Sequence, residues 1–403
     1  MTQLTHCRIA NVGWNLEAKA GGIYRSVLNF RNALEASAAE VRVIHLAQRE
    51  TGSFPGEAVR IEATSIPILK EYSWCHGVYR QGFESMIRSA DVCFLHGLFI
   101  HGLDKAASIR WRCNKPYMVV VHGSLDPYVF SYRRLRKRLW LYARGRSVLE
   151  RAARVVFSSR REIEKAQWCG IPYKPVVINW PVPVWPACNK LEVAARVLGR
   201  HGLRPGTRIL LFCGRLHPSK RPLETIEAFC QTASRDWVFL LVGPPSREIP
   251  ADRLRSACED TGGRCLYLGP AFGDVLREYY EAADLFVSLS LKDNFGYTIA
   301  DALAAGVPVL IGKGVDIFPD VEREGAGFIV ADESSAGFDR ALKLALSFNA
   351  GELAAMGARG RQWVGRTLSM DRFQEQLSVL VRDVLRDHES SFAHVPVDAE
   401  GTR

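Results

Sequence analysis

The sequence of 403 residues has no Cys-x-x-Cys pair, no internal repeat of fixed period and no apolar run near the roughly 20 residues that span a bilayer. Its ten cysteines are scattered, which in a chain of this length indicates reduced thiols in a cytosolic protein rather than a disulfide framework or a zinc site. Residues 1–11 lack the charged-then-apolar pattern of a signal peptide. We therefore expect a cytosolic protein without a transmembrane helix.

Acidic residues are scarce in the first part of the chain. Residues 1–180 hold 27 of the 53 Lys and Arg residues but only 14 of the 43 Asp and Glu residues, and the whole chain has a formal net charge of +10. A basic first half beside a mildly acidic second half indicates that one half faces a polyanion. A membrane surface, a phosphorylated acceptor and nucleic acid all fit that description.

Short β-branched runs alternate with helical patterns from end to end. The length suffices for two domains, and the apolar content of 47% is typical of a globular protein. In the first half, strands are expected at 8–12, 41–47, 92–96, 117–122, 155–158 and 176–178. In the second half, strands are expected at 209–213, 238–242, 265–268, 285–289 and 308–311. The alternation predicts an α/β protein whose parallel sheets are covered by helices on both faces.

A proline-rich break divides the chain. The closely spaced Pro181, Pro183 and Pro186 cannot propagate a helix or a central strand, and Pro205 precedes a fresh strand. The predicted parts are an N-terminal domain at 1–180, a linker at 181–206, a C-terminal domain at 207–360, final helices at 361–390 and a flexible tail at 391–403.

Residues 292–309 are the most informative stretch of the chain. Asp293 precedes a predicted helix, Asp301 lies inside it, and Gly296 makes the turn at its start. Amides at a helix N-terminus attract phosphate, and the partial positive charge of that terminus adds to the attraction. A carboxylate on each side can accept hydrogen bonds from sugar or ribose hydroxyls. The stretch therefore indicates a nucleotide-sugar enzyme.

A glycine turn and two His-Gly pairs are the candidate features of the first half. Gly21 and Gly22 lie between the first strand and a helix, where they would let the backbone approach a phosphate or simply make a strand–helix turn. His96 and His122 each end a predicted strand, and open α/β sheets bind ligands at the carboxyl ends of their strands. Structural roles for the two histidines remain the alternative.

The second half opens with a comparable turn after its first strand, at residues 212–222. Gly214 is followed by Arg215 and Lys220, and a helix comes next. Arg can donate a bidentate fork to phosphate oxygens and Lys supplies a point charge, so the pair would stabilise a leaving diphosphate. The alternative is a loop of solvated basic residues.

Residues 132–146 hold seven basic residues and no acidic one. Leu135, Leu139 and Tyr142 fall on one helical face. A basic amphipathic helix with an aromatic edge can lie on an anionic membrane surface, although a solvated charged face packed on its own domain fits equally well. A nucleic-acid arm is disfavoured because no other segment is typical of a nucleic-acid-binding module. The residues predicted to meet the membrane are Arg133, Arg134, Arg136, Lys137 and Arg138.

In their order along the chain, these motifs resemble the retaining GT-B glycosyltransferases of family 4, in particular the bacterial members that build polysaccharides and lipid-linked oligosaccharides. The matching pieces are Gly21-Gly22 and residues 91–97, 115–127, 214–220, 241–244, 283–287 and 293–309. The resemblance covers about residues 8–385. It implies two Rossmann-like domains with doubly wound parallel sheets that face a central cleft, with the final helices crossing back to the first domain.

For the C-terminal domain, the resemblance implies that the nucleotide sugar binds here. Asp301 would bind the ribose hydroxyls and Asp293 would face the transferred sugar, while Arg215 and Lys220 would neutralise the departing diphosphate. The backbone groups that would support the sugar and diphosphate are Gly214 and the amides of Asn294, Phe295 and Gly296.

For the N-terminal domain, the resemblance implies acceptor binding. Gly21 and Gly22 would bring the backbone to the diphosphate, His122 would sit by the reacting sugar, and His96 is a second candidate on the acceptor side. The implied reaction is transfer with retention to a saccharide or lipid-linked saccharide acceptor, at the cytoplasmic face of the membrane. No cofactor or metal is expected, and no Asp-x-Asp motif occurs in a plausible loop.

The chain departs from the family pattern at two places. The family usually has Glu where this chain has Asp293 and Asp301; the shorter side chains imply a closer ligand, a water-bridged contact or weaker activity. Trp180 follows Asn179 where many relatives have glycine, so the details of the hinge between the domains are not predicted. Two other functions stay open: another GT-B chemistry, such as a phosphorylase or a sugar-nucleotide epimerase, and a catalytically weakened nucleotide-sugar-binding protein.

Overall fold

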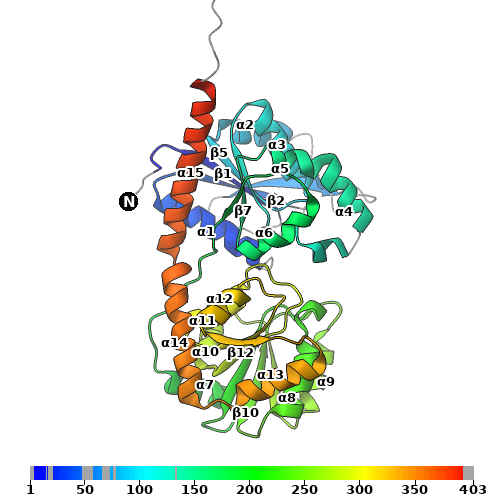
Figure 1. Cartoon of the computed structure of the whole chain (residues 1–403), viewed down its shortest axis with the longest axis vertical. Helices are drawn as coiled ribbons and strands as arrows, with labels where there is room; N and C mark the ends of the chain where they lie inside the picture. Colours follow the sequence, from blue (N-terminus) through cyan, green and yellow to red (C-terminus); the bar gives the residue numbers. More distant parts are fainter. Residues whose placement is uncertain are drawn as a thin grey trace, which may run out of the picture. The chain divides into compact units, whose positions relative to one another are not determined.

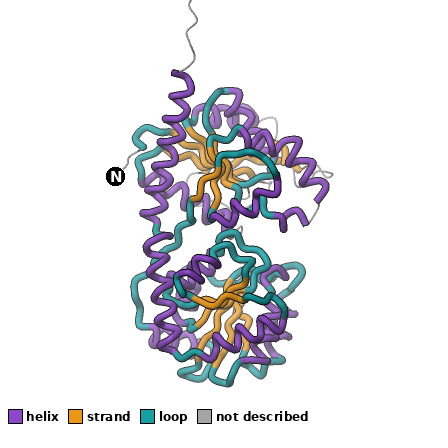
Figure 2. The backbone as a smooth tube through the Cα atoms, viewed as in Figure 1, coloured by secondary structure: helices purple, strands orange, loops and turns teal. Residues whose placement is uncertain are grey.

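The computed structural model describes residues 4–14, 16, 21–47, 58–65, 73–75, 79–131 and 134–393. The chain divides into two compact units. Unit 1 comprises Met1–Pro181 and Met370–Arg403, and unit 2 comprises Val182–Ser369. In each unit the strands gather in the middle and helices surround them (Figures 1 and 2).

Unit 1 is built on an eight-stranded sheet in the order β4-β3-β2-β1-β5-β6-β7-β8. Neighbouring strands are parallel except β3 and β4, which are antiparallel. The strands are β1 (Arg8–Trp14), β2 (Glu40–Ala47), β3 (Ala58–Ser65), β4 (Ser73–Cys75), β5 (Val92–His96), β6 (Tyr117–Val120), β7 (Arg154–Phe157) and β8 (Pro175–Val177). After β4 the chain resumes on the other side of β1, so the direction of winding reverses between β1 and β5.

Helices and short helical turns cover this sheet (Figure 1). They are α1 (Gly22–Ala36), α2 (Tyr79–Ser89), α3 (His101–Arg112), η3 (Pro127–Ser131), α4 (Arg134–Trp140), η4 (Leu141–Gly145), α5 (Arg146–Glu150), α6 (Arg160–Ala166), η5 (Gln167–Cys169) and α15 (Met370–Ala393). The long α15 packs beside α1, where Ser37 Oγ and Ser378 Oγ lie 2.8 Å apart and the rings of Phe30 and Phe373 meet edge to face. The last helix of the chain is therefore part of unit 1.

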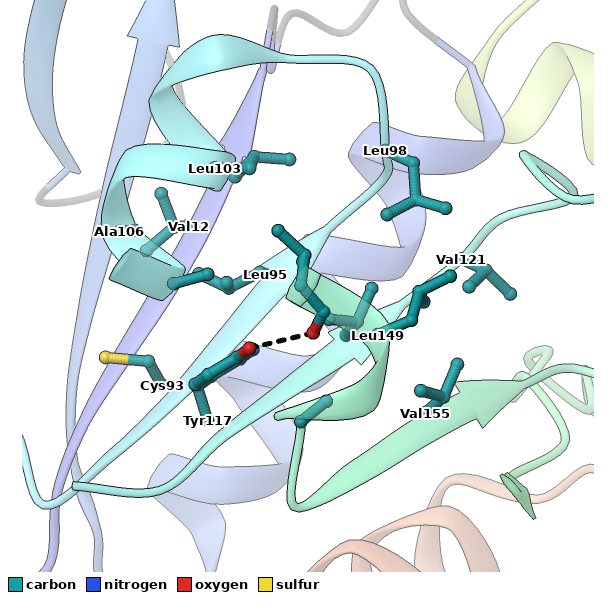
Figure 3. Packing of buried hydrophobic residues seen from close by; sticks show 14 of the residues in the cluster. Val12, Cys93, Leu95, Leu98, Leu103, Ala106, Tyr117, Val121, Leu149 and Val155 are labelled. Carbon is teal, nitrogen blue, oxygen red and sulfur yellow. Dashed lines mark hydrogen bonds between the residues drawn. The ribbon is translucent and has the colours of Figure 1, made fainter. Parts of the chain in front are cut away.

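The core of unit 1 lies on both faces of the central strands. Every residue of β5 and β6 is buried, as expected of parallel strands covered by helices on two sides. Figure 3 shows side chains from these strands packed against α3 and α5, with the Tyr117 hydroxyl donating to the Val148 carbonyl at 2.7 Å. Burial of each such apolar side chain is worth roughly 1.5–3 kcal/mol, so the ends of these strands are firmly placed.

Unit 2 has a six-stranded, wholly parallel sheet in the order β11-β10-β9-β12-β13-β14. The strands are β9 (Arg208–Cys213), β10 (Trp237–Val242), β11 (Cys265–Gly269), β12 (Leu285–Ser288), β13 (Val309–Gly312) and β14 (Gly327–Val330). When the strands are numbered 1 to 6 in chain order from β9, they lie in the order 3-2-1-4-5-6. This is the arrangement of dinucleotide-binding folds, in which ligands bind where the order reverses. Here that switch point lies between β9 and β12.

The helices of unit 2 lie on both sides of its sheet (Figure 2). They are α7 (Lys190–Arg200), η6 (Pro218–Lys220), α8 (Pro222–Thr232), α9 (Ala251–Glu259), α10 (Gly273–Ala282), α11 (Tyr297–Ala304), α12 (Phe318–Arg323), α13 (Ser335–Ser347) and α14 (Ala350–Thr367). No helix within the described residues is long and apolar enough to cross a bilayer.

All eleven predicted strands are present, and the predicted α/β class is confirmed. Three strands were missed. β14 is only four residues long and starts with glycine, β4 is a three-residue strand at the edge of its sheet, and β3 lies next to it. Among the described strands, the antiparallel pairing of β4 with β3 is the one exception to the predicted parallel arrangement.

The stretch 181–206, predicted as a linker, contains helix α7. Val193, Val197 and Leu198 are buried on one face of α7, and Arg200 pairs with Glu278 of α10 at 2.5 Å. The helix is therefore an integral part of unit 2. Of the final helices predicted at 361–390, α14 lies in unit 2 and α15 in unit 1. Most of the predicted tail, residues 394–403, lies outside the described residues.

Candidate functional site

Two loops meet at the switch point of unit 2, one after β9 and one after β12. The amide of Leu291 donates to the Ser219 carbonyl at 2.8 Å, which joins the two loops through their backbones. Lys220 Nζ donates to Asp293 Oδ2 at 2.6 Å, which joins them through their side chains. Both side chains keep about a fifth of their surface exposed, so the pair is accessible from solvent.

The first loop depends on a close approach between two glycine backbones. Gly214 has φ +145° and Gly243, after β10, has φ +147°. A Cβ at Gly243 would lie 1.8 Å from the Gly214 carbonyl oxygen, so no side chain fits there. The loop continues through Leu216, whose amide donates to the Pro244 carbonyl at 2.9 Å. This packing leaves the Arg215 side chain exposed and without a hydrogen-bond partner among the described residues.

The second loop is fixed by backbone contacts around Asp293. The Asp293 amide donates to the Gly314 carbonyl, and the Asp293 carbonyl accepts from the Asp316 amide, both at 2.9 Å. A Cβ at Gly314 would lie 2.2 Å from the Ser290 carbonyl oxygen, which explains the glycine. The loop conformation is thus set independently of any ligand.

The Asp293 carboxylate folds back on its own loop. Oδ1 accepts from the Gly296 amide at 3.1 Å while Oδ2 accepts from Lys220. Gly296 has φ +75° and is the N-cap residue of α11. The Phe295 side chain is 3% exposed and anchors the loop in the core. Asp293 therefore lies at the N-terminus of α11, and the Gly296 amide, predicted to support the diphosphate, is occupied by Asp293 in this structure.

Asp301 lies in the second turn of α11 and is 7% exposed. It is close enough to the Cys213 thiol at the end of β9 for its charge to act on it: burial raises the pKa of Cys213 to about 12, and Asp301 adds to the increase. Asp301 is thus beside the strand end from which Arg215 projects. The side chains of Asn294 and Tyr297 at the start of α11 are half-buried.

The residues predicted to bind the nucleotide sugar in the C-terminal domain lie in one region of unit 2. Gly214, Arg215, Lys220, Asp293 and Asp301 all lie at the carboxyl ends of β9 and β12 or at the start of α11. The Lys220–Asp293 ion pair was not predicted, because the sequence assigned separate roles to the two residues. The shorter side chain of Asp at position 293 allows its carboxylate to reach the Gly296 amide three residues ahead.

In unit 1, the glycine turn lies at the start of α1. Gly21 is the N-cap residue with φ +67°, and a Cβ there would meet nothing within 4 Å. Glycine is therefore suited to this position by its backbone conformation, and both Gly21 and Gly22 are exposed. Residues 17–20, which precede them, lie outside the described residues.

The two predicted histidines form a hydrogen-bonded pair. His96 Nδ1 and His122 Nε2 are 2.9 Å apart, and the rings are stacked with centroids 5.2 Å apart. His96 ends β5 and is 1% exposed, whereas His122 follows β6 and keeps part of its surface exposed. Burial lowers the pKa of His122 to about 3, and burial with the neighbouring His122 lowers the pKa of His96 well below its ordinary value. Both imidazoles are therefore neutral at pH 7.

Sequence reasoning missed Glu162, which holds the segment that carries His122. Its side chain is 2% exposed; Oε1 accepts from the Gly123 amide at 2.5 Å, and Oε2 accepts from the Ser158 amide and hydroxyl at 2.7 and 2.8 Å. His122 itself has φ +46°, which is uncommon for a residue with a side chain. The sequence did offer one signal for Glu162: it is the third helical residue after Ser159, which is the N-cap.

The basic segment carries an exposed apolar row. Leu135 is 85% exposed, Leu139 73% and Tyr142 50%. Arg134 is exposed too, whereas Lys137 Nζ donates to the Val129 carbonyl at 2.7 Å and Arg138 stacks 5.7 Å from the Trp168 ring. The predicted face is therefore apolar in its centre and only partly basic. Arg133 lies outside the described residues.

The described residues contain no group of three or more His, Cys, Asp or Glu side chains arranged to hold a metal ion. Arg215 and Lys220, the cations predicted for phosphate binding, both lie in the segment that follows β9.

Sequence comparison identifies related enzymes. Residues 20–184 match the family model described as Glycosyltransferase Family 4, and residues 197–363 match that of Glycosyl transferases group 1. GDP-mannose:cellobiosyl-diphosphopolyprenol alpha-mannosyltransferase of Xanthomonas campestris is 30% identical over 275 residues, which cover 66% of this chain and 67% of that protein. The protein of the same name from Xanthomonas oryzae is 28% identical over 312 residues, which cover 73% and 76%. D-inositol 3-phosphate glycosyltransferase of Actinosynnema mirum is 31% identical over 201 residues, 46% and 47% of the two chains.

Solved structures share the fold. HepE of Anabaena in complex with UDP and glucose superposes with a TM-score of 0.75 at 16% identity, over 94% of this chain and all of that one. Sucrose-phosphate synthase of Thermosynechococcus elongatus gives a TM-score of 0.73 at 17% identity, over 95% of this chain and all of that one. Together with the two parallel sheets and the site at the β9–β12 switch point, these matches show that the chain belongs to glycosyltransferase family 4 and has a two-domain GT-B fold.

Proposed function

We propose that the protein is a retaining glycosyltransferase that moves a hexose from a nucleoside-diphosphate sugar to a saccharide or lipid-linked saccharide in polysaccharide biosynthesis. The observation that carries the proposal is the Lys220–Asp293 pair at the switch point of unit 2, at the N-terminus of α11. A cation and a helix N-terminus suit a diphosphate, and a carboxylate beside them suits a sugar hydroxyl. This combination matches the diphosphate and the adjoining sugar of a nucleotide sugar.

The proposed mechanism relies on charges that this chain supplies. As the bond between sugar and diphosphate breaks, negative charge grows on the departing phosphate, and Arg215 and Lys220 stabilise it there. The acceptor oxygen bonds to the anomeric carbon on the face that the phosphate leaves, and the departing phosphate takes the proton of that hydroxyl. The configuration at the anomeric carbon is therefore retained. Asp301 binds the ribose and His122 contacts the transferred sugar. In this mechanism no metal ion is required.

The names of relatives support the donor class. The two Xanthomonas proteins are named as GDP-mannose-dependent alpha-mannosyltransferases that act on a diphosphopolyprenol-linked saccharide. HepE structures contain UDP, UDP with glucose, or UDP-glucose. We therefore propose a nucleoside-diphosphate hexose as donor and a lipid-linked saccharide as the first acceptor class to test.

Purified protein supplied with GDP-mannose or UDP-glucose and a polyprenyl-diphosphate disaccharide is expected to release the nucleoside diphosphate and lengthen the saccharide by one hexose. Activity is expected to persist in EDTA, and NMR of the product should show the anomeric configuration of the donor. Phosphate-dependent release of sugar 1-phosphate would instead identify a phosphorylase, and conversion of the donor into an isomer an epimerase. Donor binding without turnover on any acceptor would identify a binding protein.

The same acceptor class gives the basic segment a function. We propose that residues 134–142 lie on the cytoplasmic face of an anionic membrane, with Leu135 and Leu139 inserted at the level of the headgroups. Two leucines exposed by 85% and 73% on a helix rich in arginine are the combination expected for such contact. The protein would then be peripheral to the membrane that carries its acceptor.

Neutralising Arg134, Arg136 and Arg138 with glutamine is expected to weaken binding to phosphatidylserine vesicles about 100-fold at low salt, at about 1 kcal/mol per charge. The loss should shrink as salt is raised, because screening removes the same contribution. Vesicle sedimentation measures both effects.

A matched control removes three exposed basic residues of unit 2, Arg247, Arg253 and Lys343, and should leave vesicle binding unchanged. A double Leu135→Ser, Leu139→Ser variant should weaken binding at every salt concentration. Equal binding by the arginine variant and the control would support the solvated-face interpretation.

A further inference from the structure

The hydrogen bond between His96 and His122 raises the question of which ring carries the shared hydrogen. Each neutral imidazole carries one hydrogen on one of its two nitrogens. The 2.9 Å contact between His96 Nδ1 and His122 Nε2 requires one hydrogen between them, so one ring donates and the other accepts. The choice decides whether the remaining nitrogen of His122, Nδ1, donates to a ligand or accepts from it.

The surroundings of His96 Nε2 decide which of the two rings donates the hydrogen bond. This atom is buried and has no hydrogen-bond partner within the described residues. If His122 donated, the hydrogen of His96 would lie on this nitrogen as a buried, unpaired N–H, which is destabilising. If His96 donates from Nδ1, the buried nitrogen carries only a lone pair, a less costly group to leave unpaired. The favoured arrangement therefore places the shared hydrogen on His96.

Aromatic rings shield His96 and one side of His122 from water. Phe30 meets the His96 ring edge to face at 4.9 Å, and the Trp180 ring lies 5.6 Å from His122. Trp180 is 3% exposed and packs on Phe30 and Phe373. The low local polarity around His96 strengthens the hydrogen bond between the rings and raises the cost of the alternative tautomer.

We propose that His96 is a positioning residue that donates from Nδ1 to His122 Nε2 and so fixes His122 as the tautomer with hydrogen on Nδ1. His122 thereby presents a hydrogen-bond donor to its ligand and does not act as a base. Its chemical partner is an oxygen acceptor, either a hydroxyl of the transferred sugar or a phosphate oxygen. The catalytic consequence rests on the proposed function, but the tautomer itself does not.

The tautomer can be observed without turnover. Protein labelled with ¹⁵N-histidine is examined by long-range ¹⁵N–¹H correlation at pH 7, and a His122→Gln variant assigns the signals of His122. We expect the pattern of a neutral ring protonated at Nδ1 for His122, and the same pattern for His96. A His122 ring protonated at Nε2 would overturn the proposal.

Two substitutions of His96 test its role. In His96→Asn the amide nitrogen takes the place of Nδ1 and can still donate, whereas His96→Leu fills the space without a donor. We expect the Asn variant to keep the His122 tautomer and to be clearly more active than the Leu variant, whose kcat/KM falls about 10-fold, the scale of one lost hydrogen bond. His122 in the Leu variant should show a mixture of tautomers.

These experiments test the positioning role of His96 separately from the proposed glycosyl transfer. Identical tautomers and rates in the Leu and Asn variants would refute the positioning role. If the Leu variant does not fold, loss of the Nδ1 tautomer in the folded Asn variant would refute it as well. The expected tautomer in a protein that transfers no sugar would leave the positioning of His122 intact and count against the proposed function alone.

Discussion

Replacing Lys220 by alanine is expected to lower kcat/KM about 100- to 1,000-fold, the usual loss when a group that stabilises transition-state charge is removed. In the structure Lys220 Nζ lies 2.6 Å from Asp293, at the point where the loops after β9 and β12 meet. Its removal takes away a cation from the proposed diphosphate site and releases Asp293 from its ion pair. The residual Asp293 charge would then repel the diphosphate, so both binding and chemistry should suffer.

The effect should be measured as kcat/KM for the nucleotide sugar and as the dissociation constant of the nucleoside diphosphate. A Lys343→Ala variant, which removes an exposed lysine from α13 of the same unit, is the matched control and should retain full activity. Combining Lys220→Ala with Arg215→Ala should lower turnover further. Normal turnover by the double variant would contradict the proposed assignment of the diphosphate site.

The location of the site could be predicted from the sequence because it follows from local pattern and sheet topology. Buried apolar runs at 209–213 and 285–289 predicted the strands, and the residues directly after them must lie at the carboxyl edge of a parallel sheet. The resemblance to family 4 then placed Gly214, Lys220 and Asp293 in one site. In the structure β9 pairs with β12, so the segments that follow the two strands lie side by side as expected.

The contacts within each site could not be predicted, because they join residues far apart in the chain. The Lys220–Asp293 pair spans 73 residues and the His96–His122 pair spans 26. Glu162 holds Gly123 across 39 residues, and its pattern alone predicts only a helix cap. Such contacts depend on strand order and side-chain direction, which periodicity does not contain.

The edge strands of unit 1 and helix α7 of unit 2 were also beyond the sequence. α7 was hidden in a proline-rich stretch because its apolar face consists of only a few residues, Val193, Val197 and Leu198. Trp180 stood out as a departure from the family pattern, but only the structure shows why a large ring fits there. It fills the space beside Phe30, His122 and Phe373, and so completes the enclosure of the histidine pair.

The second large effect is expected from Gly243→Ala. The new Cβ would lie 1.8 Å from the Gly214 carbonyl oxygen, and the backbone at φ +147° is one that alanine rarely adopts. Overpacking costs about 1–3 kcal/mol and the strained backbone about as much again, so the free energy of unfolding should fall by about 3 kcal/mol or more. For a unit of this size that corresponds to a drop in melting temperature of about 10 °C.

The same substitution links stability to function. Gly214 must move to accommodate the Cβ, and the next residue, Arg215, would move with it. The affinity for GDP or UDP should therefore fall together with the melting temperature. Thermal unfolding with and without nucleotide measures both, since a ligand that binds only the folded state raises the melting temperature. Gly365→Ala in α14, where a Cβ meets nothing within 4 Å, is the matched control and should be neutral or stabilising by about 0.5–1 kcal/mol. A Gly243→Ala protein as stable as this control, with unchanged nucleotide affinity, would show that the close approach of Gly243 to Gly214 does not shape the site.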